Sequence, residues 1–189
     1  TADKKNIMQE AKDIFYDKEF VLNLDQNPYL LGMQNGVIDF KTKCFRKGKP
    51  EDYISLNTNI TYAPVDPVKD SQTVEEIKQF MQQLFPIKEL ERYLWEHLAS
   101  TLIGTSQNQT FNMYLGVGQN GKSILTNLME RVLGDYKCDV PTTLITEKRA
   151  KVGGLTPEIV GMKGRRYAVM QEPSKGEAIN EGVMKQLTS

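Results

Sequence analysis

The 189-residue chain has one histidine, His97, and two cysteines, Cys44 and Cys138, which lie 94 positions apart. A single histidine excludes a histidine-rich metal site and a pair of catalytic histidines. The cysteines have neither metal-ligand nor redox spacing, and this usage predicts a reduced intracellular protein. Any chemistry of the chain must therefore use carboxylates, lysines, hydroxyl groups and backbone amides.

Long apolar runs are also absent. No run reaches the roughly 18 residues of a membrane span, and the N-terminal sequence has no short apolar core of a signal peptide. The 24 basic and 24 acidic residues give no net charge, but residues 1–110 carry −3 and residues 111–189 carry +3. A basic half suits phosphate groups of nucleotides or nucleic acid, although three charges are also ordinary scatter for a surface.

Residues 1–105 predict a small, mainly helical α+β domain. Apolar spacing indicates an amphipathic helix over residues 3–22. Asn35-Gly36 between apolar runs predicts a hairpin within residues 29–40, because both residues tolerate positive φ. The basic residues 41–49 are typical of a turn. Two further short strands are predicted at residues 53–56 and 60–62.

Two helices should complete this domain. One begins at Ser71 and ends before Pro86, and the next covers residues 88–103 and ends at Gly104. His97 lies in the second helix, where we expect a surface position. The expected buried side of that helix is Leu90, Leu94, Trp95, Leu98, Leu102 and Ile103. The polar stretch 105–110 is interpreted as the boundary to a second domain, residues 106–189.

The second domain contains a phosphate-binding motif, since Gly116 to Ser123 fits G-x-x-x-x-G-K-[ST]. Glycines let the backbone curl so that its N–H groups point at a phosphate, and Lys122 would reach the β- and γ-phosphates. The Ser123 hydroxyl would bind Mg²⁺. The predicted binding residues for ATP or another nucleoside triphosphate are Gly116, Val117, Gly118, Gln119, Asn120, Gly121, Lys122, Ser123 and Ile124.

The flanking sequence agrees with such a loop. Residues 111–115 predict a buried strand, and the apolar stripe from Ile124 to Leu133 predicts a helix that ends at Gly134. The helix dipole would favour a bound anion. A second strand begins at Arg166 and would be stopped by Pro173, which leaves Glu172 at its carboxyl end. Glu172 would orient the attacking water, help to hold Mg²⁺, or both.

Other classes of protein with this phosphate-binding loop can be distinguished by their further motifs. The chain has no Asp-x-x-Gly after the loop, no Asn-Lys-x-Asp, and no Leu-Ser-Gly-Gly-Gln. Regulatory GTPases and transporter ATPases are thereby disfavoured. Small-molecule kinases and oligomeric motor ATPases remain.

With these residues in place, the chain resembles the poxvirus-type superfamily 3 helicases, the primase-helicases of large DNA viruses, with relatives in phages and plasmids. The resemblance covers roughly residues 28–189 and rests on four segments in order. They are Asn35 to Asp39 with residues 50–53 and 60–64, the loop Gly116–Ser123, the segment Arg166–Pro173, and Lys185 to Ser189. Gln171 before Glu172 fits this branch, which often keeps a single acid there.

The resemblance implies a fold and a way of working. The fold would be α/β: a collar-like domain over residues 1–105, then the first part of an AAA+-like phosphate-loop ATPase with a parallel sheet and flanking helices. Its sensor, DNA hairpin and arginine finger would follow Ser189. Lys122 and Glu172 would be catalytic, in a hexameric ring around single-stranded or forked DNA, with a neighbour supplying the arginine. Candidate DNA contacts are Lys148, Arg149, Lys151, Lys163, Arg165, Arg166 and Lys185.

The expected function is ATP-driven DNA unwinding in viral or mobile-element replication. It would take place in the host cytoplasm or nucleus, with no membrane, and a primase domain or other replication proteins would be partners. Two other interpretations stay open. One is a nucleotide-gated assembly or origin-loading ATPase without helicase activity, and the other is a small-molecule kinase.

Overall fold

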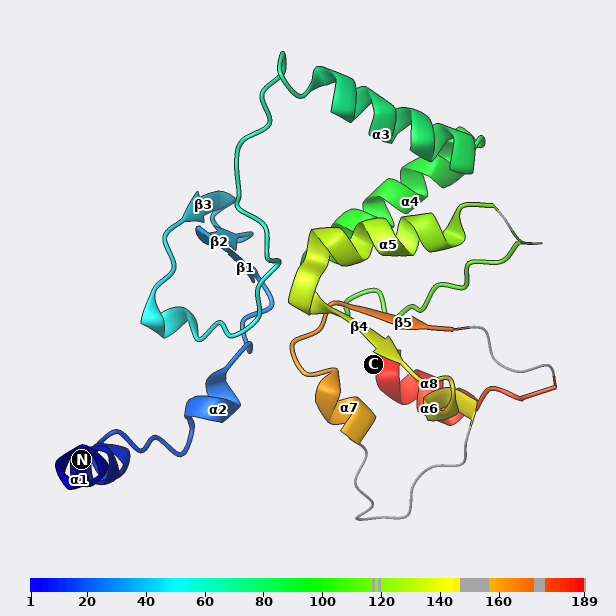
Figure 1. Ribbon diagram of the computed structural model, residues 1–189. Helices are drawn as coiled ribbons and strands as arrows, with labels where there is room; N and C mark the ends of the chain where they lie inside the picture. The colour runs from blue at the N-terminus through cyan, green and yellow to red at the C-terminus, as the bar shows by residue number, and fades with distance from the viewer. Residues whose placement is uncertain (117, 119, 147–156, 172–175, 189) are drawn as a thin grey trace.

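The computed structural model describes residues 1–116, 118, 120–146, 157–171 and 176–188. Over these residues the chain is a mixed α/β protein with two small sheets (Figure 1). The helices are α1 (Ala2–Ile14), α2 (Phe20–Asn23), α3 (Ser71–Leu84), α4 (Lys88–Ser100), α5 (Lys122–Leu133), α6 (Thr143–Thr146), α7 (Pro157–Gly161) and α8 (Glu181–Thr188). The strands are β1 (Leu30–Met33), β2 (Gly36–Asp39), β3 (Cys44–Arg46), β4 (Lys137–Val140) and β5 (Tyr167–Met170). The 3₁₀ turns are η1 (Pro50–Asp52) and η2 (Gly134–Tyr136).

The predicted hairpin is confirmed as β1 and β2. The strands are antiparallel and Met33 pairs with Gly36, so Gln34 and Asn35 form the two-residue loop. Neither Asn35 nor Gly36 has a positive φ, and our reason for the turn was therefore wrong. Gly36 is needed for close approach instead, because a Cβ there would lie 2.4 Å from the carbonyl oxygen of Arg46 on β3.

A third strand extends this sheet where only a turn was predicted. β3 pairs antiparallel with β2. The predicted strands at 53–56 and 60–62 do not form. That stretch instead makes isolated backbone bonds beside β1: Thr58 N–H donates to the Gly32 carbonyl at 3.0 Å, and Gln34 N–H to the Ile60 carbonyl at 2.9 Å. The left-handed backbone of Asn59, φ 61°, separates the two bonds and prevents a continuous ladder.

The helix predicted over residues 3–22 is wrong in its length. α1 ends at Ile14 and α2 is a separate turn. Asp17 divides them, because its carboxylate accepts the Glu19 N–H at 2.9 Å and so offers the backbone a turn in place of the helix. The apolar side of α1 is not covered within the described chain: Ile7 and Ile14 are 64% and 71% exposed.

The two helices that follow are confirmed, although α4 ends at Ser100 rather than at residue 103. Pro86 separates α3 from α4, as expected from its missing N–H. Leu94 and Leu98 are buried, but Leu90 and Trp95 are 45% and 39% exposed, so the predicted buried face of α4 was too wide.

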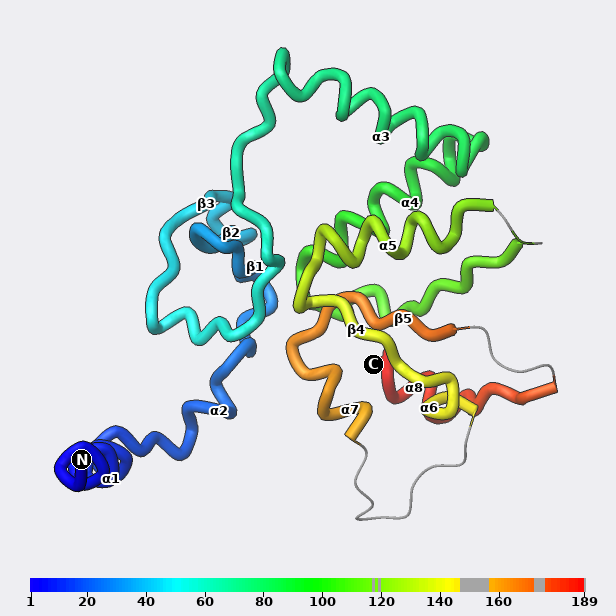
Figure 2. The backbone as a smooth tube through the Cα atoms, viewed as in Figure 1, coloured from blue at the N-terminus to red at the C-terminus, as the bar shows by residue number. Residues whose placement is uncertain are grey.

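The second half of the chain contains the predicted helix α5 and a two-stranded parallel sheet. α5 ends at Gly134 as predicted, and β5 lies where the strand after Arg166 was expected, parallel to β4. A strand over residues 111–115 is not formed, which corrects that prediction. Among the described residues this segment belongs to neither sheet, and Leu115 is 84% exposed while only Tyr114 packs against the core. An apolar segment becomes a buried strand only where neighbouring strands and helices cover it. Figure 2 shows the segment as an extended trace leading to the loop before α5.

The main core joins both halves of the sequence. It combines Leu31 of β1, Leu94 and Leu98 of α4, and residues of α5, η2 and β5. The buried residues of this core are Leu31, Met81, Leu94, Leu98, Leu125, Met129, Leu133, Tyr136 and Tyr167. The division into residues 1–105 and 106–189 stays a prediction.

Polar bonds reinforce the same junction. Tyr136, 2% exposed, accepts the N–H of Gly32 at 2.8 Å and donates its O–H to the carbonyl of Leu56 at 3.0 Å. Next to it, Asp135 N–H donates to the Asn57 carbonyl at 2.8 Å, and its carboxylate accepts the Asn57 N–H at 3.1 Å. The loop after β3 is thereby held against the turn that follows α5.

Candidate nucleotide-binding site

The phosphate-loop motif lies at the N-terminal end of α5. Gly118 and Gly121 have φ of 102° and 80°, a conformation that L side chains rarely adopt. Gly121 is the residue before the helix, and α5 begins at Lys122. The first N–H groups of a helix have no partner within it and carry partial positive charge. The glycines thus place the start of a 12-residue helix directly behind the loop.

Lys122 folds back across its own loop. Its ammonium donates to the Asn120 side-chain oxygen at 2.8 Å and to the Gly116 carbonyl at 3.2 Å. Both acceptors are neutral, and no carboxylate of the described residues lies within 4.0 Å of this ammonium. This arrangement is suited to an anion that replaces those neutral oxygens.

The structure brings the described motif residues together. Gly116 and Asn120 contact the Lys122 ammonium, and Gly121 directly precedes Lys122. The next two residues lie exposed on the first turn of α5: Ser123 and Ile124. Val117, Gln119 and Glu172 lie outside the described residues. The carboxyl end of β5, which precedes Glu172, lies on the same side of the molecule as the start of α5 (Figure 1). The roles predicted for Lys122, Ser123 and Glu172 stay predictions.

α4 holds the segment that leads into the loop. Tyr93 donates its O–H to the Asn112 side-chain oxygen at 3.2 Å, and the Asn112 amide lies 3.4 Å from Nδ1 of His97. The rings of Tyr93 and His97 stack. His97 is half-buried rather than on the surface as expected, and this burial lowers its pKa. Its contacts make it a support for residue 112.

Two of the predicted DNA contacts serve the interior instead. The Arg166 guanidinium donates to the carbonyls of Leu30 and Leu102 and lies 4.5 Å over the Tyr136 ring. Burial lowers its pKa. Arg165 donates to the carbonyl of Asp135. Both arginines therefore join β5 to the rest of the core.

The remaining candidates differ. Lys163 donates to the Val21 carbonyl at 2.9 Å and fixes α2. Lys185 is exposed on α8. Lys148, Arg149 and Lys151 lie outside the described residues. The network around Arg166 had no sequence signal, because its acceptors are backbone carbonyls 64 and 136 positions away.

The described part of the chain holds no cluster of three or more histidine, cysteine or acidic residues that could bind a metal ion. Within the same residues, every helix is too short or too polar to cross a membrane.

Comparison with known proteins gives this site its family context. Residues 1–86 match the family described as "D5 N terminal like". The chain is 38% identical over 185 residues to "Putative helicase L207/L206" of Acanthamoeba polyphaga mimivirus, covering 98% of the chain. The chain is a relative of the D5-type primase-helicases of large DNA viruses. It is also 31% identical to "Putative helicase 121R" of Invertebrate iridescent virus 3, and 29% identical to "Putative primase C962R" of African swine fever virus, covering 99% and 98% of the chain.

These matches confirm the resemblance found in the sequence. The chain spans 19% of the length of the mimivirus protein and 20% of that of the iridescent virus protein. The alignment to the mimivirus protein covers 185 residues, whereas the family model covers residues 1–86.

Proposed function

We propose that the chain carries the nucleotide-binding part of an ATP-dependent DNA helicase motor that acts in viral genome replication. The observation that carries the proposal is the loop before α5, where the Lys122 ammonium donates to Gly116 and Asn120 and forms no ion pair with any carboxylate that the structure describes. The relatives named as helicases and primases support the choice of DNA as the polymer on which the motor acts. ATP and Mg²⁺ are the proposed cofactors.

The residues of the loop fit a bound nucleoside triphosphate. Glycines at 118 and 121 leave the backbone N–H groups accessible, and Lys122 would exchange its two neutral oxygens for the β- and γ-phosphates. Mg²⁺ would supply charge neutralisation, with the exposed Ser123 hydroxyl as its protein ligand. Glu172 is proposed to orient water. A neighbouring subunit of a hexamer would supply the arginine. The hexameric ring would enclose single-stranded or forked DNA and move along it.

The test is steady-state ATP hydrolysis by the protein, with and without single-stranded DNA at low salt. We expect DNA to stimulate turnover, and Lys122→Ala to weaken triphosphate binding by about 10–100-fold, the loss of one charged bond pair of roughly 1.5–3 kcal/mol. Lys78→Ala, an exposed lysine of α3, is the matched control and should change neither quantity. Glu172→Gln should keep binding and lose turnover.

The alternatives appear as distinct outcomes of the same experiment. Tight ATP binding with negligible turnover at every DNA concentration would overturn the motor proposal in favour of an assembly ATPase. Turnover that ignores DNA but requires a small-molecule acceptor would indicate a kinase. Hydrolysis by Glu172→Gln at the parent rate would remove that carboxylate from the proposed site.

A further inference from the structure

The most basic run of the chain lies far from the loop, on the three-stranded sheet. Residues 41–49 hold four lysines and Arg46 and no acidic residue. The sequence suggested only a turn here. We call the four lysines the hairpin patch: Lys41, Lys43, Lys47 and Lys49.

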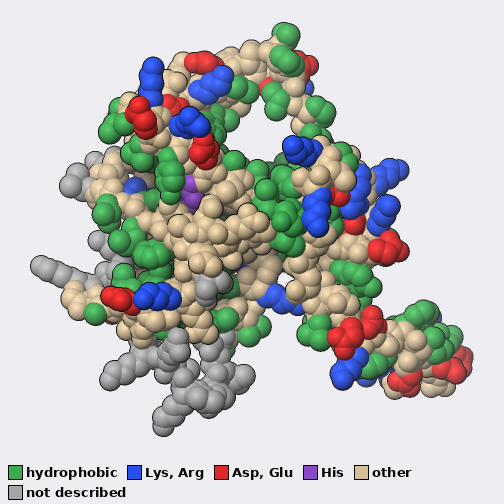
Figure 3. All heavy atoms as spheres, turned by 180° about the vertical axis from the view of Figure 1, so that it is seen from behind, with side chains coloured by type: hydrophobic (Ala, Val, Ile, Leu, Met, Phe, Trp, Pro, Cys, Tyr) green, Lys and Arg blue, Asp and Glu red, His purple; other side chains and the backbone are tan. Residues whose placement is uncertain are grey.

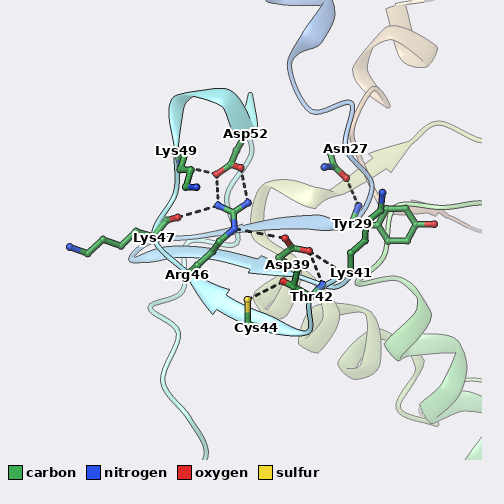
Figure 4. A network of polar contacts seen from close by, with 10 residues as sticks. All are labelled: Asn27, Tyr29, Asp39, Lys41, Thr42, Cys44, Arg46, Lys47, Lys49 and Asp52. Atoms are coloured by element: carbon green, nitrogen blue, oxygen red, sulfur yellow. Dashed lines mark hydrogen bonds and ion pairs between the residues drawn. The ribbon is translucent and has the colours of Figure 1, made fainter.

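Arg46 pairs with the carboxylates of Asp52 and Asp39. It donates to both oxygens of Asp52 at 2.8 and 2.7 Å, and lies 3.8 Å from Asp39 (Figure 4). Its bonds hold the pKa of Asp52 below its usual range. Asp39 also accepts the backbone N–H groups of Lys41 and Thr42 at 3.0 and 3.2 Å. The two carboxylates thus fix the shape of the hairpin.

On this fixed frame the four lysines form no ion pair within the described chain, and the Lys41 ammonium lies 4.7 Å over the Tyr29 ring. All four are exposed, and in the described chain no carboxylate lies within 4.0 Å of their ammonium groups. Figure 4 shows Lys47 extending away from the sheet. Figure 3 shows Lys and Arg side chains gathered on this part of the surface. Over residues 39–52, five cations outnumber three carboxylates.

We propose that the hairpin patch binds the phosphate backbone of single-stranded DNA. The proposal rests on the proposed function and adds a contact with DNA outside the nucleotide site. Lysines bind phosphates as flexible point charges without reading the sequence, which suits a moving contact.

A lipid surface would need apolar anchors between the lysines. Phe45 is the one large apolar side chain of the run, and it stacks on Tyr62 with ring centroids 4.5 Å apart. A Cβ at Gly36 would lie 2.7 Å from the Phe45 ring, so the ring is directed at the sheet. The patch therefore offers charge without an anchor, which favours a soluble polyanion.

The test compares two double variants of equal charge: Lys43→Gln with Lys47→Gln, and Lys4→Gln with Lys5→Gln on α1, where both lysines are also exposed. Binding of a fluorescent oligo(dT) to the protein is titrated from 50 to 200 mM salt, alongside ATP hydrolysis without DNA. Each lost phosphate contact lowers the slope of log K against log salt by about 0.7, so the patch variant should lose about 1.4. Lys43→Arg with Lys47→Arg should restore it.

The outcomes separate the two proposals. Equal slopes of log K against log salt for the patch variant, the α1 variant and the parent would overturn the proposal for the patch. If the parent still binds DNA and hydrolyses ATP in that case, the motor proposal is unaffected. A parent protein that binds no oligo(dT) at 50 mM salt would overturn the motor and the patch together. A lower slope for the patch variant alone, with unchanged basal hydrolysis, supports the patch.

Discussion

Arg166 offers a direct test of whether a basic residue before β5 serves DNA or the fold. In Arg166→Met the side chain keeps its apolar stem but loses its bonds to the carbonyls of Leu30 and Leu102. Bonds to a charged donor contribute about 1.5–3 kcal/mol each, and a desolvated ring contact contributes about 2 kcal/mol. Relief from burying the charge offsets part of this sum. We therefore expect a net loss of about 3 kcal/mol of unfolding free energy.

The assay is thermal and urea unfolding at neutral pH, combined with the oligo(dT) salt titration. A loss of about 3 kcal/mol lowers Tm by about 6–12 °C in a domain of 150–250 residues. Arg131→Met, at an exposed position of α5, is the control and should change stability by no more than about 0.5 kcal/mol. The salt slope should stay at the parent value. Parent-like stability combined with a lower slope of log K against log salt would show that Arg166 contacts DNA. That result would refute our assignment of Arg166 to the fold.

Three further predictions concern the same junction and the hairpin. Tyr136→Phe leaves the Gly32 N–H and the Leu56 carbonyl without partners and should cost about 2–4 kcal/mol in urea unfolding, whereas Tyr93→Phe, with an exposed hydroxyl bond, should cost under about 1 kcal/mol; equal losses would contradict the buried bonds. Gly134→Ala forces a Cβ to 2.3 Å from the Thr58 carbonyl oxygen at φ 53° and should reduce the yield of folded protein, and an unchanged Tm would argue against this backbone. Arg46 lowers the pKa of Asp52 in the folded protein, so this ion pair stabilises the fold at pH values above the unfolded pKa of about 3.9, and the stability is lost as pH falls through the lowered value. In Asp52→Asn the free energy of unfolding, measured between pH 2 and 6, should therefore depend less on pH.

The elements that could be predicted depend on short-range signals. Pro86 separates two helices whatever surrounds it, and the apolar stripe that follows Lys122 defines α5 through its own spacing. The hairpin was found from Asn35-Gly36, although its turn uses no positive φ. In each case neighbours within a few residues decide the structure.

The elements that were missed depend on distant partners. Residues 111–115 have the composition of a buried strand, but composition does not say whether a neighbour covers them. β4 begins at Lys137, a residue that predicts exposure. Burial opposes charge on this lysine, but bonds to Asp139 and Glu130 outweigh it and raise its pKa. The start of α5 behind the glycine-rich loop could be predicted because glycine and lysine at fixed spacing define it locally, while the chemistry of the loop stays a prediction.

The junction around Tyr136 also has a consequence for synthesis on the ribosome. Gly32 receives its hydrogen-bond partner 104 positions later, and Leu30 receives Arg166 136 positions later. At about 5–20 residues per second, the β1–β2 hairpin waits some 5–25 seconds for them. During that interval Leu31 can already meet Leu94 and Leu98 of α4, but the bonds from Tyr136 and Arg166 are still missing. The hairpin therefore completes its polar contacts only after most of this chain has been synthesised.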